Sequence, residues 1–247
     1  MAGLAVPPHV RAACPAGWQV EAVAGDAGAL HALEVPARRL VRAHSVQRPA
    51  LVMGSTQVAD VVTGTLARGV EVARRRSGGG AVWLEPGEQV WVDVVIPAGD
   101  PQWRDDVGLA PLWLGEAWAS LGADLCGPAT TRVWRDGMHH REFGRIACFA
   151  GLGPGEVTLE GRKLVGISQR RTRHAARFQC VVHLRWNPEP LLAALAPVPD
   201  ALAERLRSDV VALGTEAVNR LDSADPAGDS PGGAWWGVVA RLLAVLP

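Results

Sequence analysis

The sequence predicts an α+β fold in which a mixed, mainly antiparallel sheet is flanked by helices. Runs rich in β-branched residues occur along the whole chain, and amphipathic helical segments lie between them. These segments lack the regular strand–helix–strand spacing that a doubly wound parallel sheet requires. The length of 247 residues, with 48% hydrophobic and 20% charged residues, fits one such domain or one domain with a small appendage.

The first half of the chain is expected to supply strands separated by three helices. The helices are marked by apolar residues at three- and four-residue steps, and the strands by β-rich runs between turn residues. Val90–Ile96 is the clearest strand and ends at Pro97. The other expected strands are Trp18–Val23 at an edge, Leu40–His44, Ala50–Met53 and Val70–Ala73, and the expected helices follow Asp26 to about Val35 and span Val58–Arg68 and Asp105–Leu121.

The second half is expected to continue the sheet and to end in helices. Phe178–Trp186 is long enough to be a central strand. The remaining expected strands are Arg145–Phe149, Val157–Leu159 and Lys163–Ile167, and the expected helices are Pro188–Leu195, Ala201–Leu213 and an amphipathic Trp235–Leu246, with a loop over 224–233.

Composition excludes several classes of protein. With 25 basic and 25 acidic residues the formal net charge is zero, so no broad nucleic-acid or membrane surface is expected. The four cysteines, Cys14, Cys126, Cys148 and Cys180, form no C-x-x-C pair, so we expect neither a disulfide framework nor a metal site. No charged leader precedes an apolar run, and reduced thiols are usual in the cytoplasm, so the expected location is cytoplasmic.

Lys163 is the only lysine among the 25 basic residues, all others being arginine. A position that stays lysine in such a chain is expected to need a compact point charge that the arginine fork cannot supply. A second polar feature is the loop Arg74-Arg75-Arg76-Ser77-Gly78-Gly79-Gly80 between two β-like segments. Consecutive glycines let the backbone approach a ligand closely, and their N–H groups can bind an anion. The loop is not a P-loop, because no Gly-Lys-Ser/Thr follows it.

Together these two segments resemble the biotin/lipoate protein ligase superfamily, in its lipoate–protein ligase A and octanoyltransferase branch. The matching motifs are Arg74-Arg75-Arg76-Ser77-Gly78-Gly79-Gly80-Ala81-Val82 and Gly161-Arg162-Lys163-Leu164-Val165-Gly166-Ile167-Ser168-Gln169-Arg170. Weaker similarity extends the resemblance to residues 17–195. It implies a lipoate ligase-like catalytic domain over 17–195. Outside it we expect an N-terminal extension over 1–16 and a helical extension over 196–247 packed on the same domain.

The resemblance also implies a seven-stranded mixed sheet and transfer of an acyl group to a lysine of a lipoyl carrier domain. The carrier would belong to a 2-oxoacid dehydrogenase or to a glycine cleavage H-type protein. In ligases of the family, ATP with Mg2+ first converts lipoic or octanoic acid into an acyl-AMP. By position in the motifs, the adenylate contacts would be Arg75, Gly80, Ala81, Val82 and Trp83. Ser77, Gly78 and Gly79 would shape the acyl pocket, with Gly166 and Ser168 in the second motif. Lys163 would touch both the acyl carbonyl and the phosphate, where an ammonium stabilises developing negative charge.

Two departures from the family pattern leave the reaction open. The usual His-Asp pair after the glycine loop is replaced by Leu84-Glu85, and the usual Asn by Glu88, which weakens the case for ATP. Cys148 lies fifteen positions before Lys163, at a spacing similar to that of the nucleophile in one class of octanoyltransferases. A cysteine can accept an acyl group as a thioester, although a small apolar residue buried in a strand is the competing interpretation.

Three functions therefore stay open at the level of sequence. The first is an ATP-dependent lipoate–protein ligase, which could recruit an accessory subunit on a separate chain. The second is an octanoyltransferase that takes its acyl group from an acyl carrier protein through Cys148. The third is a degenerate member of the family that binds an acyl or adenylate ligand without catalysis. Outside the motifs, His139-His140 is expected in a surface loop and His183 in the core, and Trp83 could wall an acyl tunnel.

Overall fold

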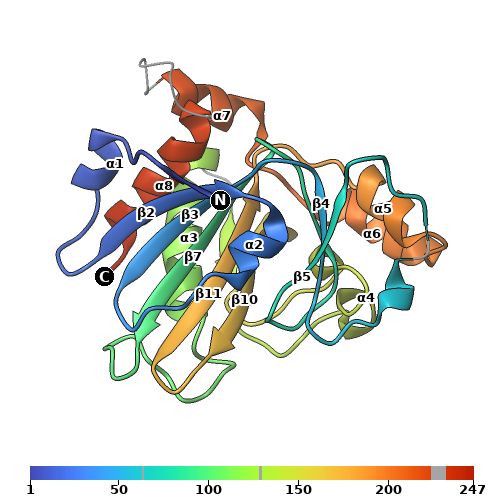
Figure 1. Cartoon of the computed structure of the whole chain (residues 1–247), viewed down its shortest axis with the longest axis horizontal. Coiled ribbons are helices and arrows are strands. Elements are labelled where there is room, and N and C mark those ends of the chain that lie inside the picture. Colours follow the sequence, from blue (N-terminus) through green and yellow to red (C-terminus); the bar gives the residue numbers. More distant parts are fainter. Residues whose placement is uncertain (63, 128–129, 224–231) are drawn as a thin grey trace.

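A computed structural model describes residues 1–62, 64–127, 130–223 and 232–247. A large twisted sheet of eight strands forms its centre (Figure 1), and every neighbouring pair in it is antiparallel except β2 and β3. Its strands, in spatial order, are β1 (Ala2–Leu4), β2 (Gln19–Gly25), β3 (Leu40–Val46), β7 (Gln89–Pro97), β11 (Ala175–His183), β10 (Arg162–Arg171), β9 (Val157–Leu159) and β8 (Thr131–Val133). The predicted α+β class and the mainly antiparallel sheet are confirmed.

A second sheet of three strands carries the glycine-rich loop. Its order is β5 (Glu71–Arg74), β4 (Ala50–Met53) and β6 (Val82–Leu84), with β4 parallel to β5 and antiparallel to β6. The expectation of one seven-stranded sheet is therefore wrong in detail. The glycine-rich loop is the connection from β5 to β6.

One face of the large sheet is covered by helices from both ends of the chain and one from its middle (Figure 1). They are α1 (Pro8–Ala12), α3 (Leu112–Cys126), α7 (Gly214–Ser223) and α8 (Gly233–Val245). Alternation along β7 turns Val90, Val92 and Val94 toward these helices, where they join the largest apolar core. The N-terminal strand β1 adds to the edge of the same sheet beside β2, so β2 is not the edge strand that the sequence predicts.

The opposite face of β7 meets α2 (Ala27–Ala32) and the small sheet. Trp91 packs there in a second apolar cluster with Leu30 and Leu84. Asp93, one step along the alternation, is fully buried, and its carboxylate binds His44 at 2.6 Å and Arg177 at 2.5 Å. A buried carboxylate costs several kcal/mol unless it is paired. Arg177 and His44 therefore offset the cost of burying Asp93 under the small sheet.

The remaining helices lie beyond the small sheet (Figure 1). They are η1 (Ala59–Val61), α4 (Arg141–Gly144), η2 (Cys148–Ala150), α5 (Glu189–Leu195) and α6 (Asp200–Ser208). Within the described part of Val58–Arg68, only the 3-10 turn η1 is helical, and Gly64 and Thr65 donate their N–H groups to carbonyls at the end of α5. The predicted helix over Asp105–Leu121 begins only at Leu112, after Pro111, whose ring disfavours helical conformation in the residue before it.

Two further predictions change in the second half of the chain. The strand predicted over Arg145–Phe149 is instead a turn after α4 followed by the start of the 3-10 helix η2. The helix predicted over Ala201–Leu213 stops at Ser208, since the following backbone pairs with Lys163 of β10. Residues 224–231 of the predicted loop lie outside the described residues. Each helix in the described part of the chain falls short of the length and apolarity that a bilayer crossing needs.

Candidate active site

Arg75 fixes the shape of the glycine-rich loop from inside. Its side chain is buried, and its guanidinium donates hydrogen bonds to the carbonyl oxygens of Gly78 at 2.8 Å and Gly80 at 2.7 Å. Gly79, between them, has φ = +95°, a conformation that favours glycine. The sequence predicts that Arg75 contacts an adenylate, but in this structure two of its donors hold the loop itself.

The loop is docked onto the turn that carries Cys148. Ala81 donates its N–H to the carbonyl of Ile146 at 2.8 Å, and Cys148 donates its own to the carbonyl of Ala81 at 2.9 Å. Gly80 sits in this contact so closely that a Cβ atom there would lie 2.6 Å from the nitrogen of Ala147. Two segments that are far apart in the sequence thus form one backbone surface around the thiol. Cys148 is half-buried at the start of η2 and packs against an apolar cluster, so it is not the buried strand residue of the competing interpretation.

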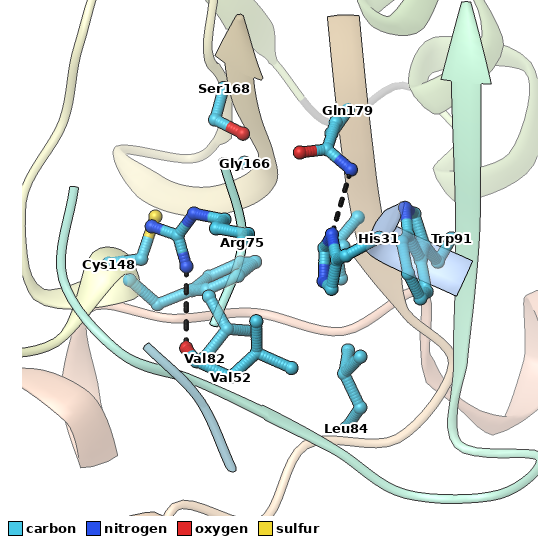
Figure 2. A pocket seen from close by; sticks show the side chains of 12 residues that line it. His31, Val52, Arg75, Val82, Leu84, Trp91, Cys148, Gly166, Ser168 and Gln179 are labelled. Carbon is cyan, nitrogen blue, oxygen red and sulfur yellow. Dashed lines mark hydrogen bonds between the residues drawn. The ribbon is translucent and has the colours of Figure 1, made fainter. Parts of the chain in front are cut away.

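A mainly apolar cavity lies beside Cys148, with an empty volume of about 410 Å³ that includes space open to solvent. Figure 2 shows Cys148 and Arg75 on one side of it and His31 with Trp91 on the other. Its apolar wall consists of Val52, Val82, Leu84, Trp91, Phe149 and Val181, and its other lining residues are His31, Arg75, Cys148, Gly166, Ser168 and Gln179. Of the predicted site residues, it therefore gathers Arg75, Val82, Cys148, Gly166 and Ser168.

Cys148 also lines an open groove on its other side. Glycines line part of this groove, namely Gly78, Gly79, Gly108, Gly144 and Gly153, and side chains such as those of Val107, Met138 and Ile167 line the rest. Gly78 and Gly79 therefore face the groove and not the apolar cavity, which differs from their predicted place in the acyl pocket. Cys148 thus lines both the apolar cavity and the groove.

Lys163 lies beneath the turn of Cys148 with its ammonium fully bonded within the chain. Nζ donates to the carbonyl oxygens of Cys148 at 3.0 Å and Gly151 at 2.9 Å, and it forms an ion pair with Glu156 at 2.7 Å. An ammonium has three N–H donors, so these three partners use all of them. Its predicted contacts with an acyl carbonyl and a phosphate stay a prediction.

Ser77 connects the loop to a buried polar chain below the cavity. Its hydroxyl lies 3.0 Å from that of Ser168 and donates to the side-chain oxygen of Gln179 at 3.1 Å. The amide nitrogen of Gln179 in turn lies 3.0 Å from Nδ1 of His31 (Figure 2). The same nitrogen lies 3.3 Å from the carboxylate of Asp93. Burial lowers the pKa of His31 to about 3, so its ring is neutral near pH 7. With Nδ1 accepting, the ring proton sits on Nε2.

Trp83 faces away from the apolar cavity. It lies between Val82 and Leu84 on β6, and strand alternation turns it to the other side of the small sheet. There it lines a separate cavity with His183 and Trp186, together with the carboxylates of Glu85 and Glu88. Trp83 therefore does not wall the cavity that begins at Cys148, as the sequence suggested it could.

Sequence reasoning missed Glu156, His31 and Gln179 at this site. Asp93 offered a signal for the polar chain, because a charged residue in the middle of an apolar strand must find a buried partner. Glu156 follows a Gly-Pro-Gly turn, and the residues around it do not form an apolar strand pattern that would predict its burial. Within the described residues, no three His, Cys, Asp or Glu side chains come together as they would to hold a metal ion.

Comparison with known proteins agrees with the motif resemblance. Residues 31–221 match the family model of the lipoyl protein ligase A/B catalytic domain. The octanoyltransferase LipM of Moorella thermoacetica is 30% identical over 139 residues, which cover 56% of this chain and 50% of the relative. The chain thus spans about half the length of that curated relative.

Solved structures share the fold at low sequence identity. A lipoate–protein ligase A bound with ATP superimposes with a TM-score of 0.54 and 16% identity, over 79% of this chain and 75% of the other. A bipartite lipoate protein ligase of Thermoplasma acidophilum, described with its E2 lipoyl domain, gives a TM-score of 0.53 and 17% identity, over 79% and 73%.

Proposed function

The chain belongs to the lipoyl protein ligase A/B catalytic domain family, and from this membership we propose that it is an acyltransferase that works through Cys148. It would take an octanoyl group from an acyl carrier protein and pass it to a lysine of a lipoyl carrier domain, without ATP. The observation that carries this proposal is the position of Cys148, which lines both the apolar cavity and the open groove.

That position suits a thioester intermediate. An acyl chain attached to the sulfur can lie in the apolar cavity, where its burial contributes about 0.8 kcal/mol per CH2 group. Its reacting carbonyl stays beside the groove, within reach of a second substrate. The half-buried thiol and the glycine backbone around it leave room for this exchange, because no side chain projects from Gly78 or Gly79.

The two steps need no cofactor for their balance. The thiolate of Cys148 attacks the carbonyl of the acyl carrier's thioester, a new C–S bond forms, and the carrier's thiol leaves with a proton. The neutral amine of the acceptor lysine then attacks the same carbonyl, the C–S bond to Cys148 breaks, and the amine's proton returns to the departing sulfur. Because a free lysine has a pKa of about 10.4, the second step draws on the neutral fraction of the amine.

One observation speaks against the ATP-dependent ligase. Lys163 has no uncommitted N–H donor to offer a phosphate while Cys148, Gly151 and Glu156 hold it.

One experiment separates the candidate reactions. The protein and an apo lipoyl domain are incubated either with octanoyl acyl carrier protein or with lipoate, ATP and Mg2+, and the products are weighed by intact mass. We expect modification with the acyl carrier alone, an acyl adduct on Cys148, and no product from Cys148→Ser. The matched control is Cys126→Ser, another half-buried thiol far from the cavity, which should keep full activity.

Each other outcome excludes the proposal. Modification that requires ATP and survives Cys148→Ser would establish the ligase. Binding of acyl ligands without any product would establish a degenerate member of the family.

Lys163→Arg is expected to lose activity, because a planar guanidinium cannot reproduce three converging bonds to one nitrogen. Lipoyl domains of 2-oxoacid dehydrogenases and H-type proteins are the acceptors to test first, each with and without an accessory subunit.

A further inference from the structure

Glu156 is a buried carboxylate with no role in the chemistry described so far. Its side chain is only 6% exposed and lies between the turn before β9 and strand β10. One oxygen accepts the N–H of Gly153 at 2.7 Å and the ammonium of Lys163 at 2.7 Å, and the other accepts the N–H of Ile167 at 3.0 Å. Glu156 therefore ties the loop, the strand and the lysine together at the floor of the groove, which it lines beside Cys148.

The ammonium of Lys163 transmits this anchoring to the nucleophile. Besides Glu156 it binds the carbonyl oxygens of Cys148 and Gly151, the residues at the two ends of η2. The lysine side chain is itself only 4% exposed, and a buried ammonium without a counter-ion costs several kcal/mol. The carboxylate thus makes it possible for a charged lysine to hold the turn.

We propose that Glu156 is a positioning residue, whose carboxylate keeps the Lys163 ammonium seated under η2 and so holds the Cys148 thiol between cavity and groove. It is not the base that deprotonates the acceptor lysine, since both of its oxygens are already engaged by Gly153, Lys163 and Ile167. The consequence for acyl transfer rests on the function proposed above, whereas the anchoring of the turn does not.

Glu156→Gln is the sharpest test. The amide keeps the size of the side chain and one acceptor oxygen for Ile167, but its NH2 group faces the donors of Gly153 and Lys163. Two quantities are measured on the full chain: the single-turnover rate of acyl-thioester formation from octanoyl acyl carrier protein, and backbone hydrogen exchange by mass spectrometry. The matched control is Glu160→Gln, an exposed carboxylate on the same hairpin.

We expect Glu156→Gln to slow thioester formation at least tenfold at saturating carrier, with little change in the carrier concentration for half-maximal rate. Exchange in the peptide that covers η2 should rise at least tenfold, while a β11 peptide keeps its protection. Glu156→Asp should recover part of the rate. Because both residues act through one ammonium, Glu156→Gln combined with Lys163→Met should be no slower than Lys163→Met alone.

Three results would overturn the proposal. The first is that Glu156→Gln changes neither the rate of thioester formation nor the hydrogen exchange of η2. The second is that the effects of the two substitutions on that rate add in the double variant. The third is that β11 also loses its protection against exchange, which would assign Glu156 a purely stabilising role. If the wild-type chain forms no acyl thioester, the proposed function fails. The exchange of η2 in Glu156→Gln against Glu160→Gln then still decides the anchoring role.

Discussion

Replacing Gly80 by alanine should separate the glycine-rich loop from the turn of Cys148. A Cβ atom at Gly80 would lie 2.6 Å from the backbone of Ala147 and of Gly144, whereas ordinary contacts begin at 3.4 Å. The loop must therefore retreat by about 0.8 Å. That movement stretches the two hydrogen bonds between Ala81 and the turn, each of which contributes about 1 kcal/mol.

The expected result is a fall of about 2 kcal/mol in the free energy of unfolding, measured by urea denaturation. Because a displacement near 1 Å at a reacting group can cost about 100-fold in rate, thioester formation on Cys148 should slow by roughly 10- to 100-fold. Gly78→Ala is the matched control for stability, since a Cβ there meets nothing within 4 Å. Its free energy of unfolding should stay within about 0.5 kcal/mol of wild type. Two results would refute this reasoning: an equal loss of unfolding free energy in Gly80→Ala and Gly78→Ala, or a wild-type rate of thioester formation in Gly80→Ala.

Three further predictions concern buried charge. Burial holds the pKa of His31 and of His183 at about 3, below the ~6.5 of an unfolded chain. Between these two pKa values the unfolded state binds more protons than the folded state. The free energy of unfolding should therefore fall by about 1.4 kcal/mol per pH unit for each histidine as the pH drops from 6.5 toward 3. A urea midpoint that stays constant from pH 7 to pH 5 would contradict this. Asp93→Asn should destabilise the fold by about 3–5 kcal/mol, because it leaves a buried arginine without its counter-ion, and a loss below 1 kcal/mol in the same assay would argue against it. Arg75→Lys should slow thioester formation at least tenfold with unchanged circular dichroism, because one ammonium cannot reproduce the fork that holds the loop carbonyls; a wild-type rate would exclude this role.

Much of the fold could be predicted because its signals are local. The apolar run Val90–Ile96 lies within β7, and Val157–Leu159 coincides with β9. The wrong predictions arise where distant segments compete for backbone hydrogen bonds. Val58–Arg68 has helical spacing, yet Gly64 bonds to the end of α5, a contact that no local pattern encodes.

In the candidate site, too, some features have a local signal in the sequence and others depend on contacts between distant segments. The motifs directed attention to the loop of Gly78–Gly80 and to Lys163, because both are unusual in composition, and the structure places both against the turn of Cys148. Alternation along β6 could have shown that Trp83 and Val82 face opposite sides. The partners of Lys163 could not be predicted, since Glu156 reaches it only through the register of the β9–β10 hairpin.

The meeting of cavity and groove at one sulfur also dictates an order of events. If the acyl donor and the lipoyl acceptor both approach through the groove, they cannot occupy it together. Each turnover then requires the emptied donor to depart before the acceptor arrives, which is ping-pong kinetics. An excess of either carrier should inhibit by occupying the form of the enzyme that the other needs. The rate in a cell would then depend on the ratio of the two carriers and not only on the amount of each.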